Sequence, residues 1–406
     1  MKKSSILIFS VLLFLAASCC NDNQGTEQKS LADTLINADA TAGNSEADRD
    51  AGEKSSQASA KPKKEDRVPP MPKKPEPKRR PIANPLSSWQ DNAHKQRIID
   101  YVKSTTTKGS KSFIDYDRRI AVFDNDGTLW SEKPTYFQIE FVFYRIKQMA
   151  PEHPEWKRDR LIKMAINHDL DGLRKKYGAP GIGRLLQITQ TGMTPAAFEK
   201  IVRQWLNNAR HPETGQLYRD MVYRPMVELV DYLKANNFQV YLVSGAELDF
   251  VRAMSEDIFH IPKNHVIASW QKLELKVKNG QYKMIKTAEH LNVIDSENKP
   301  VAIQQFIGIQ PVIAVGNSDG DLDMLAWCAT NTLKNLPIVI HHTDSLREWA
   351  YDKVSKVGVA DKILVKAKQK SWLVVDMAKD WKVIYYGTNG KNPAISQNTE
   401  ENEAKD

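Results

Sequence analysis

The chain has 406 residues, of which 41% are hydrophobic, so it is long enough for one large domain or two smaller ones with a substantial core. The formal net charge of +8 does not predict nucleic-acid binding, because residues 61–85 hold nine Lys or Arg against three Asp or Glu and so carry most of the excess. Only one of the three cysteines, Cys328, lies in the body of the chain, so the core is expected to form without disulfides.

The first residues predict export. Met1-Lys2-Lys3 and the short apolar run 6–17 are typical of a secretory signal and not of a membrane span. The run ends in Leu15-Ala16-Ala17-Ser18-Cys19-Cys20, which resembles the lipobox of bacterial lipoproteins. We therefore expect residues 1–19 to be a lipoprotein-type signal and Cys19, or else Cys20, to carry the lipid. The alternative is an ordinary cleaved signal, since Ala16 stands where the strongest lipobox has Leu.

Polar segments flank the predicted domain. Residues 20–85 have almost no large apolar side chains, and 61–85 contain eight prolines, so we expect a disordered, extended tether. Its basic half could serve as a spacer between the lipid anchor and the folded domain, or it could lie on the anionic headgroups of the membrane that holds the anchor. Residues 387–406 are again polar and are expected to be a disordered tail. The domain is thus predicted at 86–386.

Short apolar runs within 86–386 predict buried parallel strands. They are 120–123, 240–243 and 312–315, each followed by polar or glycine-rich residues. Helical patterns alternate with them, for example at 225–236. This order predicts an α/β fold, a doubly wound Rossmann-like parallel sheet, whose ligands bind beyond the carboxyl ends of the strands.

An insertion separates the first two of these strands. Roughly 100 residues lie between them, far more than one crossover helix needs, so we predict a helical cap subdomain at about 131–220. Its helices are expected at 155–167 and at 195–208, the latter with Thr194 as N-cap and Pro195 in the first turn. Residues 272–286 alternate around Asn279-Gly280, which predicts a hairpin.

The segment Asp124-Asn125-Asp126-Gly127-Thr128 directly follows the first strand. Two carboxylates so placed can differ in environment, so that one stays ionised as a nucleophile while the other carries a proton as an acid. Taken alone, the string is also compatible with a calcium loop or an acidic turn. It matches the pattern Asp-x-Asp-Gly-Thr, and here the chain resembles the phosphatases of the haloacid dehalogenase superfamily.

Three later segments match the other motifs of that superfamily in order. The resemblance implies that Ser244 and Gly245 bind the substrate phosphate and that Lys299 balances its charge. It also implies a metal loop at Gly316-Asn317-Ser318-Asp319-Gly320-Asp321, and catalytic roles for Ser244 and Lys299 beside Asp124 and Asp126. One departure stands out: Asn317 lies where the family commonly has a metal-binding aspartate, so the ligand is either its carbonyl oxygen or Asp319.

Hard oxygen ligands without nearby His or Cys favour Mg²⁺, with Asp124, Asp126, Asn317, Asp319 and Asp321 as the candidate ligands. The histidines at 153, 341 and 342 lack a metal-ligand spacing and are interpreted as ordinary surface or core residues.

The aromatic residues that follow the first motif could line the substrate mouth, but core packing under the insert is the preferred interpretation; they are Trp130, Tyr136, Phe137 and Phe141. Cys328 is expected to be a small buried hydrophobe.

The resulting hypothesis is an exported Mg²⁺-dependent phosphatase of the phosphoserine-phosphatase-like branch, acting on a small phosphomonoester through an aspartyl phosphate on Asp124. Asp126 argues against a dehalogenase, and the lack of further membrane-length apolar segments argues against an ion pump. A phosphomutase, or an exported non-catalytic binding lipoprotein on the same fold, remains an alternative.

Overall fold

The computed structural model describes residues 77–79 and 82–386. The predicted signal, the lipidation site Cys19, nearly all of the tether and the tail lie outside the described residues. Within the described part, no helix combines the length and the apolar character that crossing a bilayer requires.

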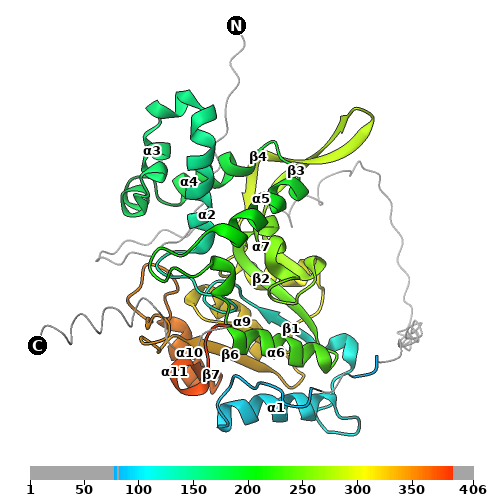
Figure 1. Cartoon of the computed structure of the whole chain (residues 1–406). Coiled ribbons are helices and arrows are strands. Elements are labelled where there is room, and N and C mark those ends of the chain that lie inside the picture. The colour runs from blue at the N-terminus through cyan, green and yellow to red at the C-terminus, as the bar shows by residue number, and fades with distance from the viewer. Residues whose placement is uncertain (1–76, 80–81, 387–406) are drawn as a thin grey trace, which may run out of the picture. The chain divides into compact units, whose positions relative to one another are not determined.

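A seven-stranded sheet forms the centre of the described chain (Figure 1), with strand order β4-β3-β2-β1-β5-β6-β7. All neighbouring strands are parallel except β3 and β4, which are antiparallel. The strands are β1 Ile120–Phe123, β2 Gln239–Glu247, β3 Val266–Lys278, β4 Gln281–Asn292, β5 Ile313–Gly316, β6 Leu336–His341 and β7 Leu373–Asp376. The three predicted strands are confirmed, although β2 runs on to Glu247 and β5 begins one residue later than expected.

Helices cover both faces of the sheet, as a doubly wound fold requires. Along β1, Ala121 and Phe123 belong to one hydrophobic cluster, whereas Ile120 and Val122 belong to the other. Successive side chains of a strand point to opposite faces, so a strand buried on both sides is apolar throughout. Cys328 lies fully buried in the second cluster, as expected, and burial raises the pKa of its thiol.

The helices outside the insert follow the strands in the usual alternation. Helix α6 agrees closely with the helix predicted at 225–236. These helices are α1 Ala93–Thr106, α6 Arg224–Ala235, α7 Leu248–Ser255, α8 Asn298–Phe306, α9 Leu322–Ala329, α10 Lys362–Lys370 and α11 Met377–Asp380.

The insert between β1 and α6 is helical, with α2 Phe137–Met149, α3 Arg160–Ile166, α4 Leu170–Gln190 and α5 Pro195–Asn208. Helix α5 has the predicted bounds, and Thr194 Oγ1 accepts a hydrogen bond from Ala197 N at 3.2 Å. The single helix predicted at 155–167 is wrong: a short 3-10 helix, Pro154–Arg158, precedes α3. The break comes at Asp159, whose carboxylate accepts from Leu161 N and Ile162 N and so caps α3.

Aromatic side chains join the insert to the sheet. Trp130, Phe137 and Phe141 are each fully buried, and Trp130 packs edge-on against Phe137 with 4.9 Å between ring centroids. Helix α5 packs against α7, and Phe141 contacts Phe250 of α7. The interpretation of these aromatics as core is therefore confirmed, while Tyr136 keeps partial exposure.

The predicted hairpin is confirmed, and Asn279 and Gly280 have φ of +51° and +72° as its turn. Figure 1 shows β3 and β4 extending as a ribbon beyond the rest of the sheet. Its outer part exposes Leu275, Val277 and Tyr282.

Candidate active site

The loop after β1 places Asp124 at the carboxyl end of the central strand. Asp124 is only 6% exposed, and its backbone N–H donates to Val315 O of β5 at 2.9 Å. Gly127 has φ of +75°, and a Cβ there would lie 2.1 Å from Asn317 Nδ2. The glycine of the motif is therefore required by both backbone conformation and close approach.

Lys299 joins two of the predicted acidic residues. Its Nζ lies 2.6 Å from Asp124 Oδ1 and 2.6 Å from Asp321 Oδ1, and all three side chains are buried. Burial and the nearby Asp321 charge raise the pKa of Asp124 despite the opposing effect of Lys299. Burial alone would lower the pKa of Lys299, but the two carboxylates outweigh it and the net shift is upward. Lys299 lies in the first turn of α8, and the structure thus brings it directly to Asp124.

Asp126 has a different environment from Asp124. It is partly exposed, and its Oδ1 accepts a hydrogen bond from the indole Nε1 of Trp130 at 2.8 Å. Burial raises the pKa of Asp126 to about 6, while the hydrogen bond from Trp130 acts in the opposite direction. A carboxyl group with such a pKa can be protonated or ionised near neutral pH, which suits a general acid and base.

The metal-loop residues separate into two groups. Asn317 and Asp321 are both buried, Asp321 shares Lys299 with Asp124, and Asp321 Oδ2 accepts from Asn317 N at 3.0 Å. Asp319 instead uses its Oδ1 to accept from Ile363 N of α10 at 2.9 Å. Of the two alternatives left open by the sequence, Asn317 is the one that lies against the catalytic loop, where its Oδ1 accepts from Thr128 Oγ1 at 3.2 Å.

Ser244 is fully buried, and its Oγ accepts from Ala246 N at 3.0 Å. Among residues 82–386, no hydrogen bond joins Ser244 to Asp124 or Lys299. Gly245 is exposed, and a Cβ there would lie 3.8 Å from the Asp295 side chain. Asp295, whose charge also acts on Lys299, was missed from the sequence because it belongs to no motif.

Buried polar residues from distant parts of the chain support the catalytic loop. His342 Nε2 donates to Gly127 O at 2.8 Å, and His342 Nδ1 lies 3.3 Å from Glu348 Oε2. Glu348 Oε1 accepts from Ser131 Oγ at 2.9 Å and from Tyr223 Oη at 2.8 Å. The sequence left open whether His342 is a surface or a core residue, and the structure shows a core residue. Its hydrogen bond to Gly127 O also holds the loop that carries Asp124 and Asp126.

The donor atoms at this site are suited to a hard cation. Asp124, Asp126 and Asp321 offer carboxylate oxygens and Asn317 an amide oxygen, which are ligands that Mg²⁺ accepts. In the described residues, no three His, Cys, Asp or Glu side chains are already arranged around a common metal position. Lys299 lies between two of the carboxylates instead. The residue types therefore fit Mg²⁺.

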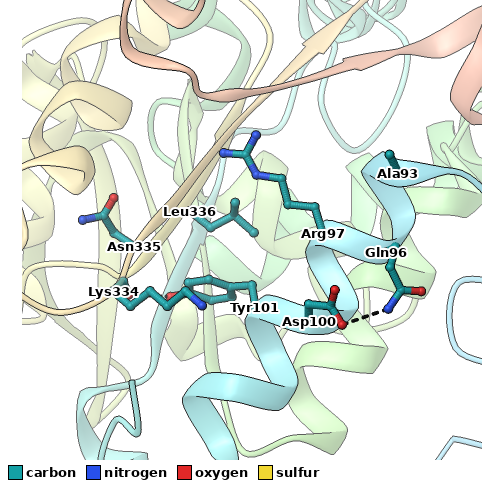
Figure 2. Close-up of a pocket in the computed structure, with 8 residues that line it drawn as sticks. All are labelled: Ala93, Gln96, Arg97, Asp100, Tyr101, Lys334, Asn335 and Leu336. Atoms are coloured by element: carbon teal, nitrogen blue, oxygen red, sulfur yellow. Dashed lines mark hydrogen bonds between the residues drawn. The ribbon is translucent and has the colours of Figure 1, made fainter. Parts of the chain in front are cut away.

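A separate surface hollow of about 450 Å³ lies between α1 and the amino end of β6 (Figure 2). Tyr101 of α1 lines it and donates to Val312 O, directly before the amino end of β5, at 3.0 Å. Arg97, Asp100 and Lys334 also line it, and it contains none of the predicted catalytic residues.

The family comparison bears on this arrangement. A model of the haloacid dehalogenase-like hydrolases matches residues 121–326, just over half of the chain. The chain belongs to this family. The match contains Asp124, Asp126, Ser244, Lys299 and the loop 316–321, so this hydrolase carries all four segments on which the resemblance was based.

Solved structures similar to this hydrolase are remote in sequence. A protein of unknown function from Bordetella pertussis is 16% identical with a TM-score of 0.41, covering 64% of this chain and 99% of its own. A functionally unknown protein from Anaerococcus prevotii is 15% identical with a TM-score of 0.44, covering 69% and 91%. A phosphoserine phosphohydrolase-like protein from Francisella tularensis is 17% identical with a TM-score of 0.35, covering 64% and 97%. These likenesses are too low to bear on activity, and no curated protein matches the chain.

Proposed function

We propose that this hydrolase is a Mg²⁺-dependent phosphatase that cleaves a small phosphomonoester through an aspartyl phosphate on Asp124. The observation that carries the proposal is the buried contact of Lys299 with both Asp124 and Asp321, next to Asp126. This arrangement supports Asp124 as a nucleophile, Asp126 as an acid and Lys299 as a fixed positive charge, all on one side of a bound phosphoryl group.

The roles follow from the different environments of the two aspartates. Asp124, held by the Lys299 ammonium group, attacks phosphorus. Asp126, held by Trp130, gives a proton to the leaving alkoxide and later takes one from the attacking water. Lys299 offsets the negative charge that gathers at Asp124, and Ser244 and Gly245 are assigned to the phosphate oxygens. When bound, Mg²⁺ would be held by Asp124, Asp126, Asn317 and Asp321 and would neutralise phosphoryl charge.

The test is hydrolysis of p-nitrophenyl phosphate by the full chain with and without MgCl₂. We expect Mg²⁺-dependent release of phosphate and its loss in the Asp124→Asn variant, with an unchanged circular dichroism spectrum. Turnover of Asp124→Asn at the normal rate would remove this residue from the mechanism. Isomerised sugar phosphate without free phosphate would favour a mutase, and phosphate-ester binding without turnover would favour a binding protein.

The four ordered motifs support an activity like that of the phosphoserine-phosphatase-like branch, and we assign substrate choice to the insert. We further propose that the chain is exported and anchored through Cys19 in the bacterial cell envelope. The support is the sequence 1–20 alone. Radiolabelled palmitate should enter the wild-type chain but not the Cys19→Ala variant in a bacterial host, and equal labelling would contradict Cys19 as the anchor.

A further inference from the structure

The metal loop departs from its family pattern at Asn317, and the structure places a carboxylate directly behind that residue. Asn317 is 1% exposed, and its Nδ2 donates to Glu132 Oε1 at 2.8 Å. Because Glu132 Oε1 acts as an acceptor for both Asn317 and Tyr351, the donor end of the Asn317 amide has to face it. The amide oxygen is then turned towards Thr128 of the catalytic loop, whose Oγ1 donates to it at 3.2 Å.

Glu132 is held rigidly in this place. It is 1% exposed, and Tyr351 Oη donates to the same Oε1 at 2.7 Å. Two glycines with positive φ pack on the carboxylate. A Cβ at Gly358, where φ is +66°, would lie 1.9 Å from Oε1, and one at Gly127 would lie 2.5 Å from it. The chain therefore closes around this carboxylate in a way that any side chain at either glycine would obstruct.

Burying a carboxylate costs free energy unless it is hydrogen-bonded. Glu132 is buried next to Asn317, which is neutral, whereas the other candidate ligand of the metal loop, Asp321, is acidic. A neutral amide at Asn317 gives the cation one negative charge fewer than an aspartate would. In its ionised form, Glu132 places a negative charge one hydrogen bond further out. Partners of metal ligands fix ligand orientation and raise ligand strength in just this way.

Resting on the proposed function, we propose that Glu132 is a positioning residue of the cation site, which orients the Asn317 amide and provides the charge that this position otherwise lacks. Asn317 and Glu132 together then do what a single aspartate does in the usual motif. Glu132 touches neither substrate nor reacting atoms in this scheme.

The experiment measures binding of MgCl₂ alone to the full chain by isothermal titration calorimetry, together with the shift in melting temperature that Mg²⁺ causes. Glu132→Gln should weaken Mg²⁺ binding by about tenfold or more, the usual loss on changing such a partner. The double variant Glu132→Gln/Asn317→Asp exchanges the donor and acceptor and moves the charge to position 317. Its Mg²⁺ affinity should exceed that of Glu132→Gln and return towards the wild-type value.

Asn317→Asp alone keeps the test decisive if Glu132→Gln does not fold. It places two carboxylates in hydrogen-bond contact, so we expect a lower melting temperature without Mg²⁺ and a larger Mg²⁺-induced rise than in the wild type. Glu140→Gln is the matched control, because Glu140 is also buried but pairs with His168 in the insert, at 2.6 Å. Its Mg²⁺ affinity should equal that of the wild type.

Unchanged Mg²⁺ affinity in Glu132→Gln, or a double variant no better than Glu132→Gln, would overturn the proposal and leave Glu132 a structural residue. An Asn317→Asp variant as stable as the wild type without Mg²⁺ would overturn it as well. If the wild type hydrolyses phosphate esters with Mg²⁺ while these results fail, only this inference falls. If the wild type binds no Mg²⁺, the proposed function falls with it.

Discussion

Replacing Lys299 by Met removes the positive charge between two buried carboxylates. Lys299 Nζ lies 2.6 Å from Asp124 Oδ1 and 2.6 Å from Asp321 Oδ1, so these oxygens are about 5 Å apart at most, where like charges repel by about 3 kcal/mol at an effective dielectric of 20. Breaking a buried ion pair by removing one partner costs about 3–5 kcal/mol. We therefore expect Lys299→Met to lose about 3–5 kcal/mol of unfolding free energy in the absence of divalent cations.

The assay is urea unfolding followed by circular dichroism, in EDTA and in MgCl₂. Mg²⁺ should restore much of the stability of Lys299→Met, because a cation can take up the repulsion between the two carboxylates. Lys286→Met is the matched control, since Lys286 is equally buried between Glu247 and Asp249, at 2.5 Å from each. It should be destabilised to the same extent with and without Mg²⁺. A Lys299→Met variant as stable as the wild type in EDTA, or one that responds to Mg²⁺ no more than Lys286→Met, would refute the reasoning.

Two further predictions concern the residues that hold the catalytic loop. Trp130→Phe removes the hydrogen bond to Asp126, and because hydrogen bonds to charged groups contribute about 1.5–3 kcal/mol, kcat should fall about ten- to a hundredfold with alkyl phosphates. The fall should be smaller with p-nitrophenyl phosphate, whose leaving group needs little protonation; equal losses with both substrates would contradict the role of Trp130. Glu348→Gln tests pH dependence: burial raises the pKa of Glu348, but hydrogen bonds from His342, Tyr223 and Ser131 outweigh it and the net shift is downward. Its stabilising effect is then present above the unfolded pKa of about 4.3 and is lost as the pH falls through the lower folded value. Urea unfolding between pH 3 and 7 should therefore show a shallower acid decline in Glu348→Gln than in the wild type, and parallel curves would speak against the assignment.

The central sheet and its loops were predictable because local signals and topology agree. A run such as 120–123, apolar at every position, is what a strand buried on both faces needs, and the residues after it lie where parallel strands end. The placement of Lys299 required the family resemblance, since nothing in its own sequence context distinguishes it from a surface lysine. The structure confirmed that it lies beside Asp124, 2.6 Å from its carboxylate.

Other parts of the site left no local signal. Glu132, His342 and Glu348 are brought together by contacts across roughly 200 residues of chain, and each alone is an ordinary polar residue in the sequence. Two strands also went unpredicted. β6 contains Pro337 as its second residue, and β7 lies at the edge of the sheet and buries only two of its four residues, so neither shows the uninterrupted buried run of a central strand.

In the insert, a local hydrogen-bonding preference breaks a helix that the apolar periodicity predicts. The apolar spacing of 155–167 fits one helix, but Asp159 is extended and its carboxylate accepts hydrogen bonds from Leu161 N and Ile162 N, so it begins a new helix at this point. Asp319, which the motif suggested as a metal ligand, accepts a hydrogen bond through its Oδ1 from Ile363 N in the first turn of α10, a contact across 44 residues that no local pattern shows.

The hydrogen bond from His342 to Gly127 O determines where this protein can be truncated without loss of function. The stretch recognised by the family model stops at 326, yet the side chains that brace the loop of Asp124 and Asp126 come from His342, Glu348 and Tyr385. A fragment cut at the recognised boundary would keep every motif residue and lose their bracing. Recombinant versions should therefore extend at least through residue 386, and inherited or engineered changes near the far end of the chain deserve to be screened for loss of activity as carefully as changes in the motifs.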